Sequence, residues 1–397
     1  MNKKLTASLT VIAVSLITAS LSRAALAQSS VTLYGTLDTG IDYISNQKTA
    51  SGGSAAWAMQ SGNVSTNRWG LKGTEDLGGG LKAVFDLENG FNVDNGKFSN
   101  GGDEFGRQAW VGISSTVYGT VTLGRQYDSM VDFVAPLSAT GSGFGGNIAD
   151  HPFDNDNLNN DFRMNNAVKF RSVNYGGLVV GGAYAFSNAS TGFNNNSAYT
   201  AGASYDRGPL SLAAAYFQAN NPGGVAAPTN TGGALSSSDG DATLVGGRQR
   251  ILGAAARYVI GPATLGAVFT RTTLDDPSEI AQGGAYVALP GNKLSFDNYE
   301  LNARYAVTPQ LNLGGSYTFT DGKFDTSTAS LSPKWNSFML QADYSLSKRT
   351  DVYLEGVYQH ATGASGVPAL GNASIYTLAA SSNGKQAVIA AGVRHRF

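Results

Sequence analysis

Apolar and polar residues alternate in this chain with a period of two, and no other feature limits its fold so strongly. In VTLYGTLDTGIDY, Val31, Leu33, Leu37, Ile41 and Tyr43 share one side. The pattern recurs in ELNARYAV, FMLQADYSL, DVYLEGVYQ and the terminal AVIAAGVRHRF. Because side chains along a strand point to opposite faces in turn, each segment is expected to form a strand with one apolar face. Helical spacing is not sustained after residue 27, so the expected fold is all-β.

Connections of two lengths alternate strictly between these segments. Seven are short, and eight are long and rich in Gly, Asn, Ser and Asp; the long ones cover roughly 44–66, 89–106, 127–164, 187–198, 218–249, 271–298, 320–336 and 360–385. Fifteen connections join sixteen antiparallel strands. Closure of such a sheet into a barrel removes the exposed edges that would recruit other chains. We therefore expect a sixteen-stranded antiparallel barrel, which is wide enough to enclose water.

Composition indicates an inside-out barrel. Charged residues form 14% of the chain, against about 25% in soluble domains. A transmembrane barrel turns apolar side chains to lipid and polar ones to its lumen. Six of the seven short turns carry a tyrosine, as expected for a belt at the membrane–water boundary: Tyr118, Tyr175, Tyr205, Tyr258, Tyr305 and Tyr344. The net charge of −1 shows no basic excess that would indicate a nucleic-acid partner.

The first 27 residues have the pattern of a secretory signal peptide. MNKK is a basic start, a mostly apolar stretch follows, and Ala25, Leu26 and Ala27 form a small-x-small cleavage site. A membrane anchor is the alternative, but the apolar stretch is short and diluted by Ser and Thr. We expect 1–27 to be removed during export and 28–397 to form one barrel domain.

Several motifs resemble a known family. SSVTLYGTLDTGI, RWGLKGTEDLGGGLKAVFDLENGF, FGRQAWVGISS, GTVTLGRQYD and the terminal GVRHRF are similar to segments of the trimeric general-diffusion porins of Gram-negative outer membranes, in their beta-proteobacterial form. The resemblance covers the whole chain after residue 27. It implies a homotrimer of sixteen-stranded barrels with periplasmic short turns and outer long loops. It also implies that the third long loop folds into the barrel and narrows it.

Alternation sorts the basic residues of the barrel wall. Trp69 and Leu71 are expected to face lipid, so their neighbours face the lumen, and the same reasoning gives the inward set Arg68, Lys72, Lys82, Arg163, Lys169 and Arg171. Alternation alone does not assign Arg107 to the lumen or to lipid. It gives Arg107 the same parity as Val111, and if Arg107 points into the lumen, Trp110 points to lipid. The porin resemblance implies wall arginines at Arg68, Arg107 and Arg163.

The third long loop carries six aspartates and no Lys or Arg before Arg163. Placed inside the barrel, these carboxylates would face the basic wall and create a transverse field at the constriction. The acids expected there are Asp132, Asp150, Asp154 and Asp156. The alternative is that the charges are scattered and solvated within the lumen.

Two further residues have separate expected roles. Arg125 shares the parity of Leu123 and Val121, so it points outward. A charge facing lipid is costly, so we expect Arg125 at a subunit interface, where it would take an acid from the second loop of a neighbouring subunit. The resemblance also implies that Phe397 is the signal read by the barrel-assembly machinery.

The expected function is passive diffusion of small hydrophilic solutes and ions, without catalysis. GSGFGG at 141–146 matches a dinucleotide motif, but it lies in a loop and lacks the strand before it and the helix after it. We therefore expect no cofactor. DNDNLNND lacks the Gly and the closing Glu of a calcium loop, so no built metal site is expected, and loose binding of a divalent cation stays open as an alternative. The expected partners are outer-membrane lipid and lipopolysaccharide. Three alternatives stay open: an adhesive or structural barrel, a barrel enzyme and a substrate-specific porin. Ion selectivity is not determined by the sequence.

Overall fold

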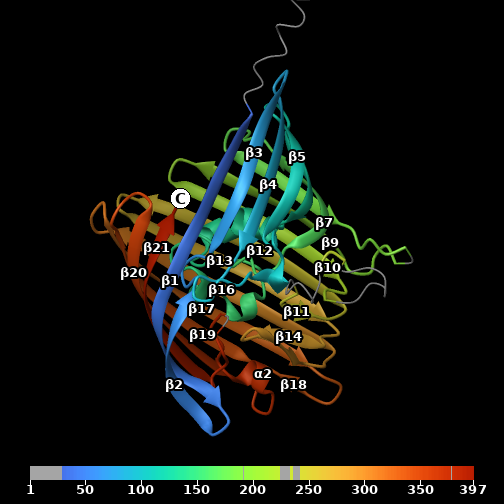
Figure 1. Ribbon diagram of the computed structural model, residues 1–397. Coiled ribbons are helices and arrows are strands. Elements are labelled where there is room, and N and C mark those ends of the chain that lie inside the picture. Colours follow the sequence, from blue (N-terminus) through green and yellow to red (C-terminus); the bar gives the residue numbers. More distant parts are fainter. Residues whose placement is uncertain (1–28, 191, 224–232, 236–241, 377) are drawn as a thin grey trace, which may run out of the picture.

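A closed antiparallel barrel forms the protein (Figure 1). The computed structural model describes residues 29–190, 192–223, 233–235, 242–376 and 378–397. The predicted signal segment therefore lies outside the described residues. The wall strands are β1 (Ser30–Thr49), β2 (Gly52–Ser61), β3 (Arg68–Gly78), β4 (Leu81–Gly90), β5 (Gln108–Ser115), β6 (Gly119–Gln126), β7 (Met164–Ser172), β8 (Leu178–Ala185), β9 (Ser197–Arg207), β10 (Leu210–Asn220), β12 (Arg248–Ile260), β13 (Ala263–Asp275), β16 (Lys293–Ala306), β17 (Leu311–Asp325), β19 (Lys334–Ser345), β20 (Thr350–Thr362) and β21 (Lys385–Arg396).

The expected number of sixteen strands is confirmed over the described ranges. The sheet contains 18 strand segments, but β18 (Ser330–Leu331) is a two-residue piece inside a loop. In addition, β2 and β3 form a single wall strand. Thr39 of β1 pairs with Ser61 and Thr36 pairs with Arg68, so residues 62–67 interrupt one continuous partner of β1.

The first long connection differs from the expected one. Residues 44–66 were predicted to be a loop, yet β1 and β2 form a hairpin with its turn at 50–51, followed by the interruption at 62–67. Gly, Ser and Ala dominate GGSAAWAMQS, so its alternation is faint. Pairing with β1 overrides this weak local preference. Five of the other seven long connections lie within the expected ranges, and those after β4 and β8 each extend one residue beyond them, to 107 and from 186; β13, β16 and β17 extend further into the expected loops.

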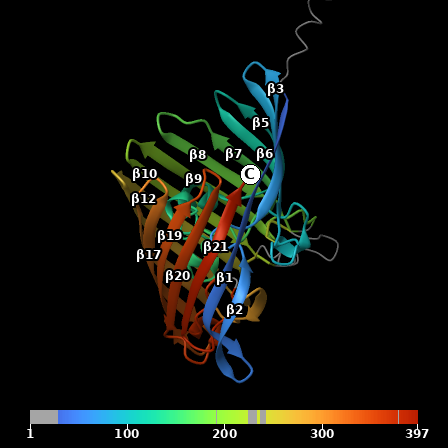
Figure 2. The ribbon, with the colours of Figure 1, turned by 60° about the vertical axis from the view of Figure 1, so that its left-hand side comes forward.

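Strand β21 closes the barrel against β1, and Figure 2 shows these red and blue strands side by side. The amide of Phe397 donates to the carbonyl of Gly35 at 3.1 Å, and the Gly35 amide donates back at 3.0 Å. The Phe397 ring covers Gly35, where an added Cβ would lie 2.4 Å from the ring. The C-terminal residue thus completes the wall, and only glycine fits opposite it.

The outer face of the barrel is apolar. Large exposed side chains on alternate positions include Val31, Leu33 and Ile41 of β1, whereas Asp38 and Asp42 of the same strand are buried on the inner side. Five of the six expected belt tyrosines are plainly exposed near the short turns: Tyr118, Tyr175, Tyr258, Tyr305 and Tyr344. Tyr205 is half-buried. No helix within the described ranges is long and apolar enough to cross a membrane.

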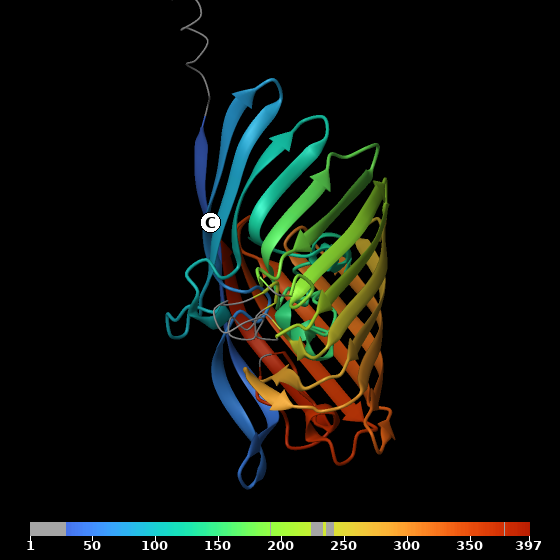
Figure 3. The ribbon, with the colours of Figure 1, turned by 90° about the vertical axis from the view of Figure 1, so that its right-hand side faces the viewer.

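Residues 127–163, here called the constriction loop, lie inside the barrel, as the turns between β6 and β7 show in Figure 3. The loop contains the short helical turns η2 (Met130–Val134), η3 (Ala135–Leu137), η4 (Asn147–Ala149) and η5 (Pro152–Asp154). It contacts inward residues around the barrel, including Thr200, Glu300 and Gln341. A separate small sheet of β11 (Leu244–Val245), β14 (Glu279–Gln282) and β15 (Ala285–Ala288) lies within two other long loops.

Candidate pore constriction

Two of the predicted wall arginines meet at one carboxylate. Glu88 points inward from β4 and accepts from Nε of Arg107 at 2.8 Å. Nε of Arg68, at the start of β3, lies 3.5 Å from the other oxygen of Glu88. Tyr34 also lies within hydrogen-bond distance of Glu88, at 3.0 Å. One buried acid therefore holds two guanidinium groups in place, so the local charge stays positive.

The third predicted arginine joins the same group through Tyr127 and Asn160. Nη2 of Arg107 donates to the Tyr127 hydroxyl at 2.7 Å and to Asn160 Oδ1 at 3.2 Å. Nη2 of Arg163 donates to the same Asn160 oxygen at 3.2 Å, and its guanidinium lies 5.3 Å from the Tyr127 ring centroid. We name Arg68, Arg107 and Arg163 the arginine cluster. The structure brings together the three residues that the porin resemblance had grouped.

Arg107 reaches this position by a route that alternation did not predict. Val111 is exposed on the outer face, and Trp110 lies on the inward row between Asp86 and Gly124, so the prediction that Trp110 faces lipid is wrong. Arg107 precedes the first residue of β5 and is not bound by the alternation of that strand. Its amide donates to the Glu88 carbonyl, which turns the side chain into the barrel.

The other predicted basic residues occupy different positions. Lys169 and Arg171 of β7 contact the start of the constriction loop: Lys169 pairs with Asp132 at 2.5 Å, and Arg171 lies over the Phe133 ring. Lys72 lies over the Tyr34 ring, next to the arginine cluster. Lys82 pairs with Asp76 in the β3–β4 register beside a short turn, so it lies away from the constriction loop.

A cavity of about 520 Å³ opens beside the arginine cluster. Arg107 and Arg163 line it together with Asp150 and Asp161 of the constriction loop. Basic wall and acidic loop thus face one space, as the predicted transverse field requires. Burial raises the pKa of the Asp150 carboxyl well above its ordinary value, and burial raises the pKa of Asp161 to about 6. The acidic side of the cavity is therefore weaker than a count of carboxyls suggests.

Three of the four predicted constriction acids do not line this cavity. Asp132 forms an ion pair with Lys169. Asp154 is completely buried and accepts the amides of Asn159 at 2.9 Å and Asp161 at 3.0 Å. Asp156 is completely buried as well and contacts His151 and Thr270. The expectation that Asp154 and Asp156 face the aqueous path conflicts with this burial: both oxygens of Asp154 accept amides of the loop itself, and Oδ2 of Asp156 is held between the loop and the wall. Asp150 alone of the four faces the cavity.

A buried ionic contact fixes the rear of the constriction loop. His151 lies between two carboxylates, 2.6 Å from Asp156 Oδ2 and 3.0 Å from Glu300 Oε2 of β16. Asn298 donates to Asp156 at 3.2 Å, and Thr270 also donates to it. Burial by itself lowers the pKa of His151, but the charges and hydrogen bonds of Asp156 and Glu300 outweigh burial and raise that pKa well above its ordinary value. We name His151, Asp156 and Glu300 the ionic anchor.

An apolar contact fixes the front of the loop. Met130, Phe133, Val134 and Leu137 pack in one buried cluster with Ala213, Ala215, Phe217, Ile251 and Val268 of the inner wall. Phe133 lies against Gly181 and Gly202, where the wall has no side chains to keep it away. We name the four loop residues the apolar anchor. The inner wall is therefore not uniformly polar: it is apolar where the loop covers it.

Arg125 lies beside the second long loop of its own chain. Its Nε donates to the Gly106 carbonyl at 2.7 Å, and Nη1 donates to Asn165 Oδ1 at 2.5 Å. These contacts give the outward-parity arginine partners without a neighbouring subunit. The predicted interface role stays a prediction.

Sequence reasoning missed several parts of this site. Tyr127 and Asn160 connect the arginines, and Tyr376 lines the cavity from the last long loop. None lies in an alternating strand, so periodicity gave no signal for them. Asp161 was visible as a loop acid, but nothing in its spacing distinguished it from its five companions.

Comparison with known proteins gives consistent matches. The sequence matches the family described as Gram-negative porin over residues 9–364. It is 31% identical to an outer membrane porin protein of Bordetella pertussis, over 94% of this chain and 96% of that one. It is 30% identical to outer membrane porin protein 32 of Delftia acidovorans, over 95% of this chain and 96% of that one.

Solved structures agree with the fold. The anion-selective porin from Comamonas acidovorans superposes with a TM-score of 0.68 at 25% identity, covering 93% of this chain and 100% of that one. A trimer form of OmpT from Vibrio cholerae gives a TM-score of 0.63 at 16% identity, with 93% and 99% covered. The second match supports the barrel fold alone.

Proposed function

Because the chain belongs to the Gram-negative porin family, we propose that it is an outer-membrane channel for passive diffusion of small hydrophilic solutes with a preference for small anions. The arginine cluster carries the proposed preference. Three guanidinium groups gather where the loop narrows the barrel, and Glu88 is the carboxylate bound among them. Charges that line a narrow, low-dielectric passage dominate its ion selectivity.

Two observations support the anion preference. Asp150 and Asp161 face the cavity with raised pKa values, so they oppose the arginines less than fully ionised carboxylates would. In addition, the Comamonas acidovorans protein, 25% identical to this chain, is described as anion-selective. Arg68 is the most accessible member of the cluster, with 31% of its side chain exposed, so permeating ions can reach it directly.

Reversal potential across a salt gradient tests the proposal. The purified protein in a planar bilayer should pass chloride in preference to potassium. Combined substitution Arg68→Gln, Arg107→Gln and Arg163→Gln should move the reversal potential toward cations. Since this would leave Glu88 unpaired, Glu88→Gln is added to the triple variant to keep the wall folded. Lys82→Gln, near a short turn, is the matched control and should change little. A wild-type protein that conducts no ions would contradict the channel itself.

A substrate-specific channel is the second candidate. The cavity of about 520 Å³ is large enough for a small organic solute, and Arg107, Arg163 and Tyr376 offer it charge, hydrogen bonds and an aromatic face. Saturable block of the ion current by one organic anion would favour this candidate. Linear flux with increasing concentration would favour general diffusion.

We further propose the assembly and partners that the family resemblance implies. These are a homotrimer in the outer membrane, contact with lipopolysaccharide, and recognition of the strand ending at Phe397 by the barrel-assembly machinery. Trp57 and Met59 of β2 remain largely exposed on the outer face, as an interface in a trimer would require. Cleavage of residues 1–27 belongs to the same proposal, and mass spectrometry of the purified protein tests it. The predicted interface role of Arg125 is tested separately: Arg125→Gln should weaken the trimer only if the Arg125 side chain contacts a neighbouring subunit.

A further inference from the structure

Two arginines outside the arginine cluster lie on the side of the constriction loop that faces the short turns. Arg257 lies three positions before the end of β12, and Arg304 lies two positions before the end of β16. Each strand end leads into a short turn, whereas the cavity beside the arginine cluster is lined by residues of the long connections. The two sets of arginines therefore lie on opposite sides of the loop. We name Arg257 and Arg304 the short-turn arginine pair.

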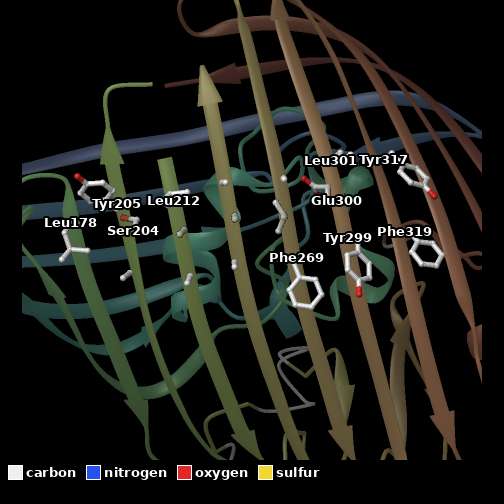
Figure 4. A pocket seen from close by; sticks show the side chains of 18 residues that line it. Leu178, Ser204, Tyr205, Leu212, Phe269, Tyr299, Glu300, Leu301, Tyr317 and Phe319 are labelled. Atoms are coloured by element: carbon white, nitrogen blue, oxygen red, sulfur yellow. The ribbon is translucent and has the colours of Figure 1, made fainter. Parts of the chain in front are cut away.

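Arg304 points into the lumen and lies over an aromatic ring of the constriction loop. On β16, Tyr299 and Leu301, which Figure 4 labels, are exposed on the outer face, and Glu300 between them is buried inside. Arg304 is four positions from Glu300 and therefore shares its face. Its guanidinium lies 5.3 Å from the centroid of the Phe144 ring. Stacking on a ring leaves the N–H groups at the edge of a guanidinium free to bind an anion.

Arg257 points into the lumen two strands away, and its hydrogen bonds are to neutral oxygens. Nη1 donates to the Pro136 carbonyl and Nη2 donates to Ser211 Oγ, each at 3.3 Å. The sheet register pairs Ser211 with Arg257 on one side and with Asp206 on the other. Within the described ranges, neither Asp206 nor another carboxylate forms an ion pair with Arg257. Its positive charge is therefore not neutralised by direct contact.

The inward carboxylates near Arg304 are bound by other arginines. Arg394 lies 3.3 Å from Asp343 and 3.0 Å from Asp351, and Arg396 lies 2.7 Å from Asp351. Asp343 attracts Arg304 from a longer distance but makes no ion pair with it. The short-turn arginine pair thus keeps an uncompensated positive charge next to the lumen.

A cavity of about 180 Å³ is lined by both members of the pair. Ser142 of the loop and Asn302 of the wall add polar groups to its lining. A guanidinium has five N–H donors. Arg257 donates two of them to neutral oxygens, and Arg304 donates one to Asn312 Oδ1 at 3.2 Å, so three and four remain. Arg304 is exposed and Arg257 is half-buried, so both can be reached from the lumen.

We propose that the short-turn arginine pair is a second anion site of the channel and binds a small divalent oxyanion such as inorganic phosphate. Guanidinium groups suit phosphate because two parallel N–H groups match two of its oxygens. The role of the site in transport rests on the proposed channel function. An anion that leaves the arginine cluster toward the short turns meets this site next. Two sites in series let one anion displace another, so binding at the first site does not stop conduction.

Block of the chloride current by inorganic phosphate at pH 8, where phosphate is mostly divalent, tests the proposal. In wild-type channels, phosphate added at the short-turn side should reduce the current, and monovalent nitrate should reduce it much less. Arg257→Gln with Arg304→Gln should raise the phosphate concentration needed from that side at least about tenfold, because charged hydrogen bonds are lost. Block from the long-loop side, where phosphate meets the arginine cluster first, should stay the same. Arg257→Lys with Arg304→Lys keeps both charges and should retain part of the block.

A matched control removes two positive charges at the same end of the barrel but outside the cavity. Lys82→Gln with Arg349→Gln should leave the phosphate block unchanged. Equal loss of block in this control would show a general charge effect, and loss from both sides in the pair variant would show that the arginines only hold the loop; either result overturns the proposal. Streptavidin on a biotinylated Ser51→Cys marks the long-loop side, since the chain has no Cys of its own.

Binding measured without conduction separates this proposal from the channel function. Crystals soaked in selenate, a divalent oxyanion with an anomalous scatterer, should show an anomalous peak between the guanidinium groups of Arg257 and Arg304. The same peak should be missing from the Arg257→Gln and Arg304→Gln double variant. A wild-type protein that shows the peak but conducts no ions would support the site and contradict the channel. A conducting wild-type protein with no peak and no block from the short-turn side would overturn the site.

Discussion

The two ends of the constriction loop are held to the barrel by different chemistry. The front end uses the apolar anchor, in which Phe133 and its neighbours pack on small residues of the inner wall. The rear end uses the ionic anchor, in which His151 lies between Asp156 and Glu300. Apolar packing is insensitive to proton concentration, whereas a buried charge pair depends on it. The comparison therefore teaches that the ionic anchor contains a group that pH can discharge, whereas the four side chains of the apolar anchor contain none; at the front end pH acts only through neighbours such as Asp128, whose pKa burial raises to about 6 and which accepts from the Met130 amide.

The largest expected effect comes from removing the centre of the ionic anchor. His151→Ala leaves two buried carboxylates facing each other without compensation, a loss of about 3–5 kcal/mol. Hydrogen exchange at residues 150–161 should accelerate strongly, while exchange at 130–137 stays slow. Unchanged protection at 150–161 would show that the anchor is not needed. Exchange at 150–161 in His151→Gln, which retains one polar contact, should be faster than in the wild type and slower than in His151→Ala.

Loss of the apolar anchor should have a somewhat smaller effect. Phe133→Ala removes a buried ring and leaves a cavity at the wall, which costs about 3 kcal/mol. Exchange at 130–137 should accelerate by the same factor at pH 6 and at pH 9. A strong pH dependence of this loss would contradict the distinction between the two anchors. Phe133→Leu is the matched variant and should cost less than half as much.

Raising the pH should release the ionic anchor alone. The pKa of His151 is raised in the folded protein, so its contribution to stability is complete below the unfolded value of about 6.5 and is lost as pH rises through the folded value. Within that window each pH unit lowers the stability of the anchor by up to about 1.4 kcal/mol. Protection factors at 150–161, which correct for the base-catalysed intrinsic exchange rate, should therefore fall at alkaline pH in the wild type. In His151→Ala the protection factors should change much less with pH over the same range.

Acidification should change ion selectivity through the rear of the loop. Asp161 faces the cavity with a pKa of about 6, so it loses up to one negative charge between pH 7.5 and pH 5. The reversal potential should shift toward anions over this range. Asp161→Asn should remove the part of the shift that this carboxyl causes, and Asp161→Asn combined with Asp150→Asn, which removes both carboxyls that face the cavity, should abolish most of it. A shift of opposite sign would mean that another group controls the passage.

The smallest expected effect concerns the contact near the front end. Lys169 and Asp132 form an ion pair whose side chains are still 15% and 17% exposed. An ion pair and a well-packed neutral pair of similar size differ little in net stability, so Lys169→Met combined with Asp132→Asn, which leaves no unpaired charge, should barely change loop protection. A thermal unfolding midpoint lowered as much as by Phe133→Ala would mean that this pair, and not the apolar anchor, holds the front end.

Alternation predicted inward and outward positions well wherever a strand was regular. Lys169 and Arg68 both came from that rule, because a strand buried on one side has only one acceptable register. The rule failed at Arg107, which lies just outside β5, and with it Trp110 was assigned to the wrong face. It gave no information on Tyr127, Asn160 or Tyr376, since loop residues have no periodicity to read.

By itself, the sequence determined the barrel. Lipid and water on opposite sides of one wall impose a period of two, and alternating short and long connections impose the number of strands. Only the tertiary structure decided which charges meet. The six aspartates of the constriction loop look equivalent in sequence, yet Asp154 and Asp156 are buried and Asp150 and Asp161 face the cavity. Whether an aspartate is buried or faces the cavity depends on contacts with strands up to about 150 residues away in the sequence, such as the contact of His151 with Glu300. Local sequence pattern cannot predict such distant partners.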